Sequence, residues 1–308
     1  MSDISTYTAR IPARGNAHRV RGVDYYINEW GDPDDPLIVF LHGWGDTGAT
    51  FQFVVDALAG RWHVIAPDWR GFGRTAHRAS GYWFPDYLAD LDDLLSKYSP
   101  SAPVRLVGHS MGGNIGGLYA GAMPERVCAF VNVEGFGLPD TNPEDAPARY
   151  REWLQRSREA PGFTRFGSLE ALARHIAGRS PGMSAAQARF VAEAWATEGQ
   201  DGPTLRADPA HKLPNAVLYR RAEAEACWRN VTAPVLLVAG ADSVVFEAVG
   251  ISPADGSLRL PFPDCRTRII EKCGHMVHFE SPGQLAAAIE GILQEKKKTT
   301  KKKKTKKI

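Results

Sequence analysis

The sequence has no run of about 18 apolar residues that would span a membrane as a helix. Its first ten residues contain no apolar segment either, so we expect no signal peptide. Cysteine is scarce, and the four that occur (Cys128, Cys227, Cys265 and Cys273) lack the spacing of a metal site. We therefore expect reduced, mostly packed thiols in a cytoplasmic protein.

Excess charge of one sign is also absent, apart from the C-terminal tail. Residues 295–308 contain nine lysines and one glutamate, so this tail carries a charge of +8 and leaves about −6 on the rest of the chain. The body of the protein therefore gives no sign of nucleic-acid binding. The tail has a single apolar residue and no core to bury, so we expect a disordered extension whose candidate partners are polyanions or membrane surfaces.

Apolar runs typical of buried strands alternate with helical patterns over the first 134 residues and again from 234 to 294. The strand-like runs are 36–41, 63–67, 104–107, 128–133, 234–239 and 265–270, with a hairpin-like pattern over 19–31. Helical patterns cover 51–58, 87–95 and 114–123, and a last helix has start signals at Ser281, Pro282 and Gln284. This alternation predicts an α/β doubly wound sheet.

The alternation stops between 135 and 233, where helical patterns cover 146–158, 168–178, 184–198 and 215–230. Ser184 followed by Gln187 forms a capping box at the start of one of these helices. We expect 1–134 and 234–294 to form one core, and 135–233 to form a helical cap over the carboxyl edge of its sheet. Six aromatic residues of the cap are expected in its core rather than in a pocket: Tyr150, Trp153, Phe163, Phe166, Phe190 and Trp195.

The segment Gly108-His109-Ser110-Met111-Gly112 lies between a predicted strand and a glycine-rich helical stretch. Strand, sharp turn and helix are the setting of a nucleophile elbow, in which a strained serine projects its hydroxyl above the sheet. Glycine is needed on either side because a Cβ would collide with the neighbouring strand and helix. The helix behind the turn holds further glycines, each unfavourable for a helix, so its backbone should pack very close to another element.

A serine hydroxyl needs a base to activate it and a carboxylate to orient that base. Asp242 follows the strand at 234–239, and His275 follows the strand at 265–270 just before the last helix. We predict Ser110 as nucleophile, His275 as base and Asp242 as its orienting carboxylate. Two alternatives remain: Glu134, which ends the strand at 128–133, in place of Asp242, and His278 in place of His275.

Acyl transfer also needs hydrogen-bond donors for the oxyanion. The backbone N–H of Met111 follows the nucleophile, and that of Trp44 lies in the turn after the first buried strand. We predict these two amides as the oxyanion hole. His42 should be a structural hydrogen-bonding residue, and His109 should pack or line the pocket. The Asp68-x-Arg70-Gly71-x-Gly73 turn should be held by an Asp68–Arg70 pair. No residue is assigned to a cofactor or a metal.

These motifs together resemble the α/β-hydrolase superfamily over residues 20–294, and within it the serine hydrolase-like proteins. The matching residues are Leu41-His42-Gly43-Trp44-Gly45, Asp68-x-Arg70-Gly71-x-Gly73, Gly108-His109-Ser110-Met111-Gly112-Gly113, Gly240-Ala241-Asp242 and Gly274-His275-Met276. Similar cap segments are Ser168–Leu172, Asp201-Gly202, Arg206–Pro209 and Lys212–Pro214. The resemblance implies a mostly parallel eight-stranded sheet flanked by helices, with a helical cap insertion. The epoxide hydrolases and haloalkane dehalogenases of this fold carry aspartate at the elbow, where this chain has Ser110.

The function that this pattern favours is hydrolysis of a small-molecule carboxylic ester through an acyl-enzyme, without a cofactor. Two alternatives use the same residues or the same scaffold differently. One is a C–C bond or thioester hydrolase with the same triad. The other is a non-catalytic binding protein on the hydrolase scaffold.

Overall fold

The computed structural model describes residues 5–77, 81–159, 161–200, 202–251 and 258–305. Its main sheet has eight strands: β1 (Arg14–Val20), β2 (Val23–Trp30), β3 (Leu37–Leu41), β4 (His63–Pro67), β5 (Val104–His109), β6 (Val127–Val133), β9 (Val235–Gly240) and β10 (Cys265–Ile270). Their order in the sheet is β1-β2-β4-β3-β5-β6-β9-β10. β2 pairs antiparallel with β1 and β4, and all other pairs are parallel. The predicted eight-stranded, mostly parallel sheet is confirmed.

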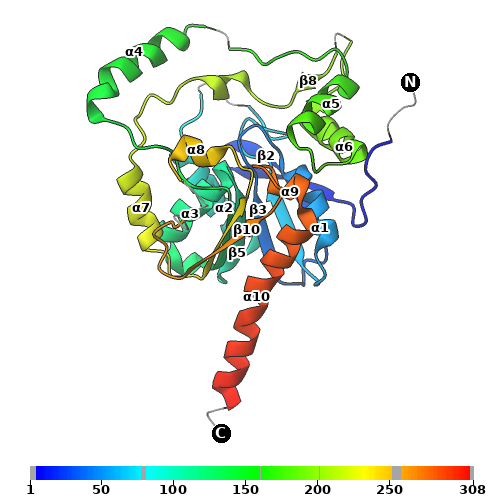
Figure 1. The fold of residues 1–308 in the computed structure, drawn as a ribbon, viewed down its shortest axis with the longest axis vertical. Helices are drawn as coiled ribbons and strands as arrows, with labels where there is room; N and C mark the ends of the chain where they lie inside the picture. The colour runs from blue at the N-terminus through cyan, green and yellow to red at the C-terminus, as the bar shows by residue number, and fades with distance from the viewer. Residues whose placement is uncertain (1–4, 78–80, 160, 201, 252–257, 306–308) are drawn as a thin grey trace.

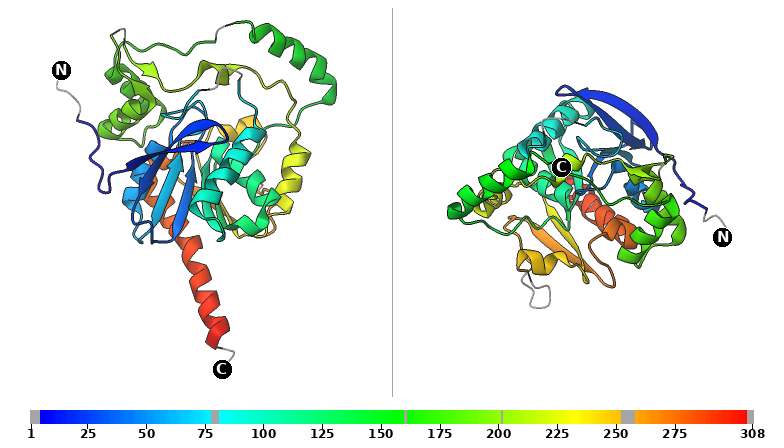
Figure 2. Two further views of the ribbon diagram at one scale, coloured as in Figure 1. Left: turned by 180° about the vertical axis from the view of Figure 1, so that it is seen from behind. Right: turned by 90° about the horizontal axis from the view of Figure 1, so that it is seen from above.

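Helices cover both faces of this sheet (Figures 1 and 2). They are α1 (Gln52–Ala57), α2 (Pro85–Tyr98), α3 (Met111–Ala122), α7 (Arg221–Arg229), α8 (Val245–Val249), α9 (Val277–Glu280) and α10 (Pro282–Thr305). One apolar core lies between the sheet and α2, α3 and α7, and a second lies between the sheet and α1 and α10. Strands buried on both faces explain the continuous apolar runs in the sequence. In the part of the chain that the structure describes, no helix is both long and apolar enough to cross a membrane.

The glycine-rich helix α3 packs very close to its neighbours, as predicted. A Cβ built on Gly121 would lie 2.0 Å from the carbonyl oxygen of Cys227, and one on Gly117 would lie 2.9 Å from Trp228 Nε1. Both contacts come from α7, so α7 packs on the sheet layer although its residues fall inside the 135–233 range expected for the cap. Alanine at Gly121 would force the two helices apart, which explains why so many residues unfavourable for a helix are present there.

The remaining inserted elements lie above the carboxyl end of the sheet (Figure 1). They are α4 (Ala146–Arg156), α5 (Leu169–Arg179), α6 (Ala185–Trp195), β7 (Ala196–Thr197) and β8 (Thr204–Leu205), with short 3-10 turns at Pro143–Asp145 and Pro209–Lys212. The helices α5 and α6 share an apolar cluster that includes Phe53 and Phe279 of the core, so this pair is anchored on the sheet layer. The capping box of Ser184 and Gln187 starts α6 as predicted.

The last helix α10 begins at Pro282 and continues to Thr305, protruding from the molecule (Figure 1). We expected 295–308 to be a disordered extension. Up to Thr305 the structure continues the helix instead, in keeping with the high helix propensity of lysine. Residues 306–308 lie outside the described residues.

Candidate active site

Ser110 lies at the junction of β5 and α3, where the structure has a strained backbone. Its φ is 52° and its ψ is −114°, a combination that costs free energy for any residue with a Cβ. Its amide donates to the carbonyl of Val133 at 2.8 Å, which holds the turn against the end of β6. The strand, sharp turn and helix predicted around this serine are therefore present.

The two glycines of the elbow are required by close backbone contacts. A Cβ on Gly108 would lie 2.4 Å from the carbonyl oxygen of Gly112, and a Cβ on Gly112 would lie 2.1 Å from that of Leu41. Real Cβ atoms do not approach a carbonyl oxygen this closely, so alanine at either position would push α3 away from β3 or β5. The expected reason for these glycines is confirmed.

The imidazole of His275 contacts Glu134. Its Nδ1 lies 2.9 Å from Glu134 Oε2, and the Glu134 carboxylate is fully buried. The same carboxylate accepts the amide of Gly240 at 2.7 Å and the hydroxyl of Ser243 at 2.5 Å. Three hydrogen-bond partners around one buried carboxylate fix its position.

This contact is the one that we predicted for Asp242, so the prediction is corrected on this point. Asp242 follows the end of β9 and lines the same pocket, but its side chain is exposed and has no hydrogen bond to His275 among the described contacts. The residue that we left as the alternative, Glu134, takes the position instead. The physical reason is that Glu134 is buried and held within reach of His275 by the Gly240 amide and the Ser243 hydroxyl, whereas Asp242 is exposed.

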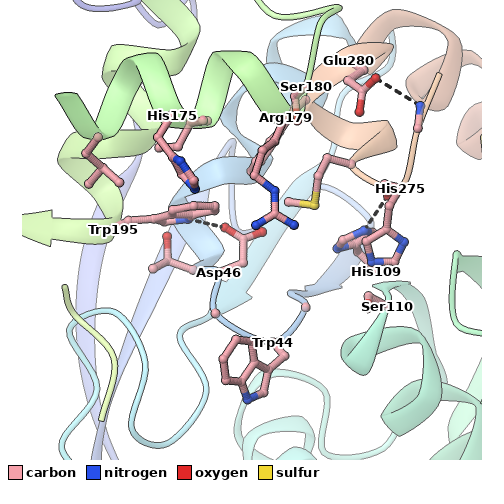
Figure 3. A pocket seen from close by; sticks show the side chains of 18 of the residues that line it. Trp44, Asp46, His109, Ser110, His175, Arg179, Ser180, Trp195, His275 and Glu280 are labelled. Carbon is pink, nitrogen blue, oxygen red and sulfur yellow. Dashed lines mark hydrogen bonds between the residues drawn. The ribbon is translucent and has the colours of Figure 1, made fainter. Parts of the chain in front are cut away.

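Ser110 and His275 line the same pocket and are drawn close together in Figure 3. In the described part of the chain no hydrogen bond joins them, and Nε2 of His275 has no partner there. Such bonds are often long before a substrate is bound. The free Nε2 is therefore available to the Ser110 hydroxyl or to a substrate.

His109, the middle residue of the elbow, holds the loop that carries His275. Its Nε2 lies 2.9 Å from the carbonyl oxygen of His275 (Figure 3). Burial, together with the nearby His278 and His275, lowers the pKa of His109 well below its usual value. The ring is thus neutral, and Nε2–H donates to the carbonyl because a carbonyl only accepts. His109 both packs and lines the pocket, as expected.

The two backbone amides predicted for the oxyanion hole are those of Met111, the residue after Ser110, and of Trp44, which lines the pocket. Met111 is the first residue of α3, so its N–H has no acceptor within the helix. Trp44 lies in the turn after β3, and its amide has no acceptor among the described backbone hydrogen bonds. Both turns border the pocket that contains Ser110. Two donors without acceptors at this place are what an oxyanion requires.

Asp46, which the sequence analysis did not single out, connects the turn of Trp44 to the cap and to α9. Its carboxylate accepts Trp195 Nε1 at 2.8 Å, His278 Nε2 at 3.0 Å and Thr50 Oγ1 at 2.9 Å. Burial raises the pKa of Asp46, but the interactions with His278, His42 and Trp195 together outweigh burial and leave this pKa below its usual value. His278, the alternative base, is therefore engaged with Asp46 and not directed to Ser110.

Among the described residues, Asp46, His109 and His278 also form a group that could offer ligand atoms to a metal ion, since one such atom from each lies within 4.8 Å of the others. Most of the possible ligand atoms of these three residues are already engaged in hydrogen bonds within the protein. Asp46 accepts three donors, and one nitrogen of each histidine has a protein partner. The other nitrogen of each ring, Nδ1, is buried without a partner in the described residues.

A pocket of about 800 Å³ extends from Ser110 to the cap. Besides Ser110 and His275, its lining includes Trp44, Phe163, Phe166, Leu172, His175, Ile176, Arg179, Trp195, Leu205, Arg206, Asp242, Lys272, Met276, Phe279 and Glu280. Phe163, Phe166 and Trp195 pack against the apolar clusters, as expected, and also line the pocket, which was not expected. Tyr150 and Trp153 are instead partly exposed on α4, and only Phe190 packs inside the cap cluster without lining the pocket.

Two further predictions concern the turns around the site. His42 is structural, as predicted: it is buried, its Nε2 accepts the amide of Trp69, and burial lowers its pKa to about 4. The expected Asp68–Arg70 pair is not formed. Arg70 instead donates to the fully buried Asp90, while Asp68 accepts the amides of Gly48 and Arg74.

Comparison with known proteins agrees with this geometry. A family model described as the alpha/beta hydrolase fold matches residues 36–282. A serine hydrolase-like protein of Danio rerio is 24% identical over 273 residues, covering 86% of this chain and 83% of that protein. A 3-hydroxybutyrate-oligomer hydrolase of Cupriavidus necator is 30% identical over 292 residues, covering 85% and 90%.

Among solved structures, the thioesterase domain from the curacin biosynthetic pathway superposes with a TM-score of 0.79 at 23% identity, covering 90% of this chain and 99% of that domain. This likeness concerns the fold. The family match spans most of the chain, including the elbow and the His275 loop, and its relatives are named as hydrolases. The chain therefore belongs to the alpha/beta hydrolase fold family.

Proposed function

We propose that this protein is a serine hydrolase that cleaves a carboxylic ester through an acyl-enzyme. The observation that carries the proposal is the strained Ser110 at the floor of a pocket that also holds the His275–Glu134 pair. A nucleophile, a base with a free nitrogen and a buried carboxylate behind that base are the parts that such chemistry needs.

In the proposed reaction, Ser110 Oγ attacks the ester carbonyl carbon and His275 Nε2 takes the hydroxyl proton. The oxyanion accepts hydrogen bonds from the amides of Trp44 and Met111. The bond from carbon to the alcohol oxygen then breaks, and His275 returns the proton to the leaving alcohol. Glu134 holds Nδ1–H of His275 and stabilises the imidazolium in both steps.

Deacylation repeats the sequence with water. His275 takes a proton from water, the oxygen attacks the acyl carbon, and the acid leaves as Ser110 recovers its proton. A relative at 30% identity is named for hydrolysing 3-hydroxybutyrate oligomers, whose monomers are joined by ester bonds, and this supports an ester as the substrate. Thioester and C–C bond hydrolysis by the same residues remain the alternatives.

The test is labelling with a fluorophosphonate probe followed by peptide mapping. We expect label on Ser110 in the native protein, and none in Ser110→Ala or His275→Ala proteins that keep the native circular dichroism spectrum. Loss of the nucleophile should also lower kcat on p-nitrophenyl butyrate by roughly 10⁶-fold, the effect in serine proteases. Folded native protein that stays unlabelled would favour the binding-protein alternative. Turnover of a panel of oxygen esters, thioesters and β-diketones distinguishes ester hydrolysis from the thioester and C–C bond alternatives.

A further inference from the structure

Three cationic side chains line the pocket without an ion pair or hydrogen bond to any described residue: Arg179, Arg206 and Lys272. For Arg206 the Nε is buried and has no partner in the described residues. Exposed arginines without a partner also occur outside the pocket, as Arg174 does, so what sets these three apart is that they line the pocket. The pocket is thus lined by positive charge, and no described side chain pairs with it directly.

Arg179 is placed to use this charge on a ligand. It is the last residue of α5, and Figure 3 shows its side chain reaching from the cap into the pocket. Leu172, His175 and Ile176 of the same helix line the pocket at the spacing that puts them on one face with Arg179. That face is apolar near the middle of the helix and basic at its end.

The carboxylates of the pocket leave Arg179 unpaired. Asp46 is occupied by Trp195 and His278, and Glu280 accepts the amide of Gly274 at 3.0 Å. Asp242 belongs to the β9 loop of the core, not to the cap, and has no contact with Arg179 among the described ion pairs. On the cap side of the pocket, Arg179 is therefore available to bind an anionic group of a ligand.

We propose that Arg179 binds a carboxylate of the substrate, so that the enzyme acts on esters that carry a carboxylate besides the scissile bond. The inference rests on the proposed ester hydrolysis. The guanidinium offers two parallel N–H donors, the geometry that matches a carboxylate. A neutral substrate would displace water from the Arg179 guanidinium without supplying new hydrogen-bond acceptors, whereas a carboxylate supplies them.

A simpler role for Arg179 is to stabilise the carboxyl end of α5 through its charge. That role predicts an effect on stability and none on the choice of substrate. Arg174 is the matched control, because it lies on the same helix, is exposed and does not line the pocket.

Binding is measured by isothermal titration in the Ser110→Ala background, where the ester stays intact. The ligands are p-nitrophenyl hydrogen glutarate against p-nitrophenyl valerate, and 4-carboxyphenyl butyrate against phenyl butyrate. These two pairs place the carboxylate in the acyl part or in the alcohol part. We expect Arg179→Met to weaken binding of the charged ester of one pair by at least about 10-fold, the effect of losing a charge-assisted hydrogen bond.

Arg174→Met should leave the ratio of charged to neutral Kd unchanged, and Arg179→Lys should give an intermediate ratio. The same preference should appear as a ratio of kcat/KM when Ser110 is present. The inference is overturned if neither charged ester binds better than its neutral partner, or if Arg179→Met leaves both ratios as they are. Binding that depends on Arg179 without turnover of any ester would refute the proposed hydrolysis alone.

Discussion

Glu134 Oε2 lies 2.9 Å from Nδ1 of His275; Glu134 directly follows β6, and His275 lies in the loop between β10 and α9. The register explains why Glu134 reaches this place. His109 of β5 pairs with Val133 of β6, so Ser110 and Glu134 are each the next residue after a paired position. Both have positive φ, 52° and 61°. Two adjacent strands thus end in two strained residues that face the same edge.

The first prediction separates Glu134 from Asp242. Glu134→Gln should lower kcat on a p-nitrophenyl ester by about 10³–10⁴-fold, because the amide no longer stabilises the imidazolium or fixes its tautomer. Asp242→Asn should change kcat by less than about threefold, since an exposed group without a contact to His275 adds little electrostatic stabilisation.

Circular dichroism and urea unfolding serve as the check that both variants fold. A severe loss in Asp242→Asn with near-native activity in Glu134→Gln would restore the assignment made from the sequence. It would also mean that the loop after β9 rearranges when substrate binds.

The second prediction concerns the hydrogen bond from Trp195 to Asp46. Trp195→Phe keeps an aromatic ring against Phe279 but removes one of three donors from a buried carboxylate. We expect the free energy of unfolding to fall by about 1.5–3 kcal/mol, the range for hydrogen bonds to charged groups. Urea denaturation measures it.

Trp153→Phe is the matched control, since Trp153 lies partly exposed on α4 with no described hydrogen bond. It should change the free energy of unfolding by less than about 0.5 kcal/mol. Equal effects of the two substitutions would show that the Trp195–Asp46 bond adds nothing to the docking of the cap.

The third prediction tests the close contact at the elbow. Gly112→Ala should destabilise the protein by about 1–3 kcal/mol or more, because its Cβ would meet the Leu41 carbonyl at 2.1 Å. Gly291→Ala, in α10, has no atom within 4 Å of its Cβ and should instead stabilise by up to about 1 kcal/mol. Thermal unfolding compares them, and a Gly112→Ala protein as stable as the native one would contradict the packing described here.

The features that depend only on a local sequence pattern could be predicted from the sequence. Continuous apolar runs predicted β3, β4 and β9, and the capping box predicted the start of α6. The elbow and the His275 loop were found because their glycines and polar residues stand directly after such runs. Local chemistry of this kind needs no knowledge of which strands are neighbours.

Features that depend on contacts between distant segments were not accessible in the same way. Asp242 and Glu134 each follow a buried strand, and only the folded chain shows that Glu134, held by Gly240 and Ser243, is the one that reaches His275. The partner of Arg70 is likewise Asp90 of α2, a distant residue, and not Asp68 in its own turn. Asp46 and Arg179 were missed because a single charged residue in a turn or at a helix end has no sequence pattern that marks it as a pocket residue.

The last prediction is that acid destabilises the protein between about pH 6.5 and pH 4. Burial lowers the pKa of His42 and of His211 to about 4, and burial also lowers the pKa of His109 well below its usual value. Below pH 6.5 the unfolded chain binds protons on these rings while the folded chain does not, so protonation favours unfolding. For His42 alone the loss approaches about 3 kcal/mol at pH 4, at 1.4 kcal/mol for each pKa unit.

Asp68 opposes this trend. Burial raises its pKa to about 6, so the folded chain binds this proton first and gains stability as the pH falls from about 6 towards 3.8. Three histidines outweigh one aspartate, and the urea midpoint should therefore fall between pH 7 and pH 4.5. In His211→Gln the side chain no longer titrates, and the dependence on pH should become shallower. A urea midpoint that stays level or rises on acidification would contradict this prediction. It would mean that these rings take up protons in the folded state, and that the surroundings of His42 and His109 are more open to water than their burial indicates.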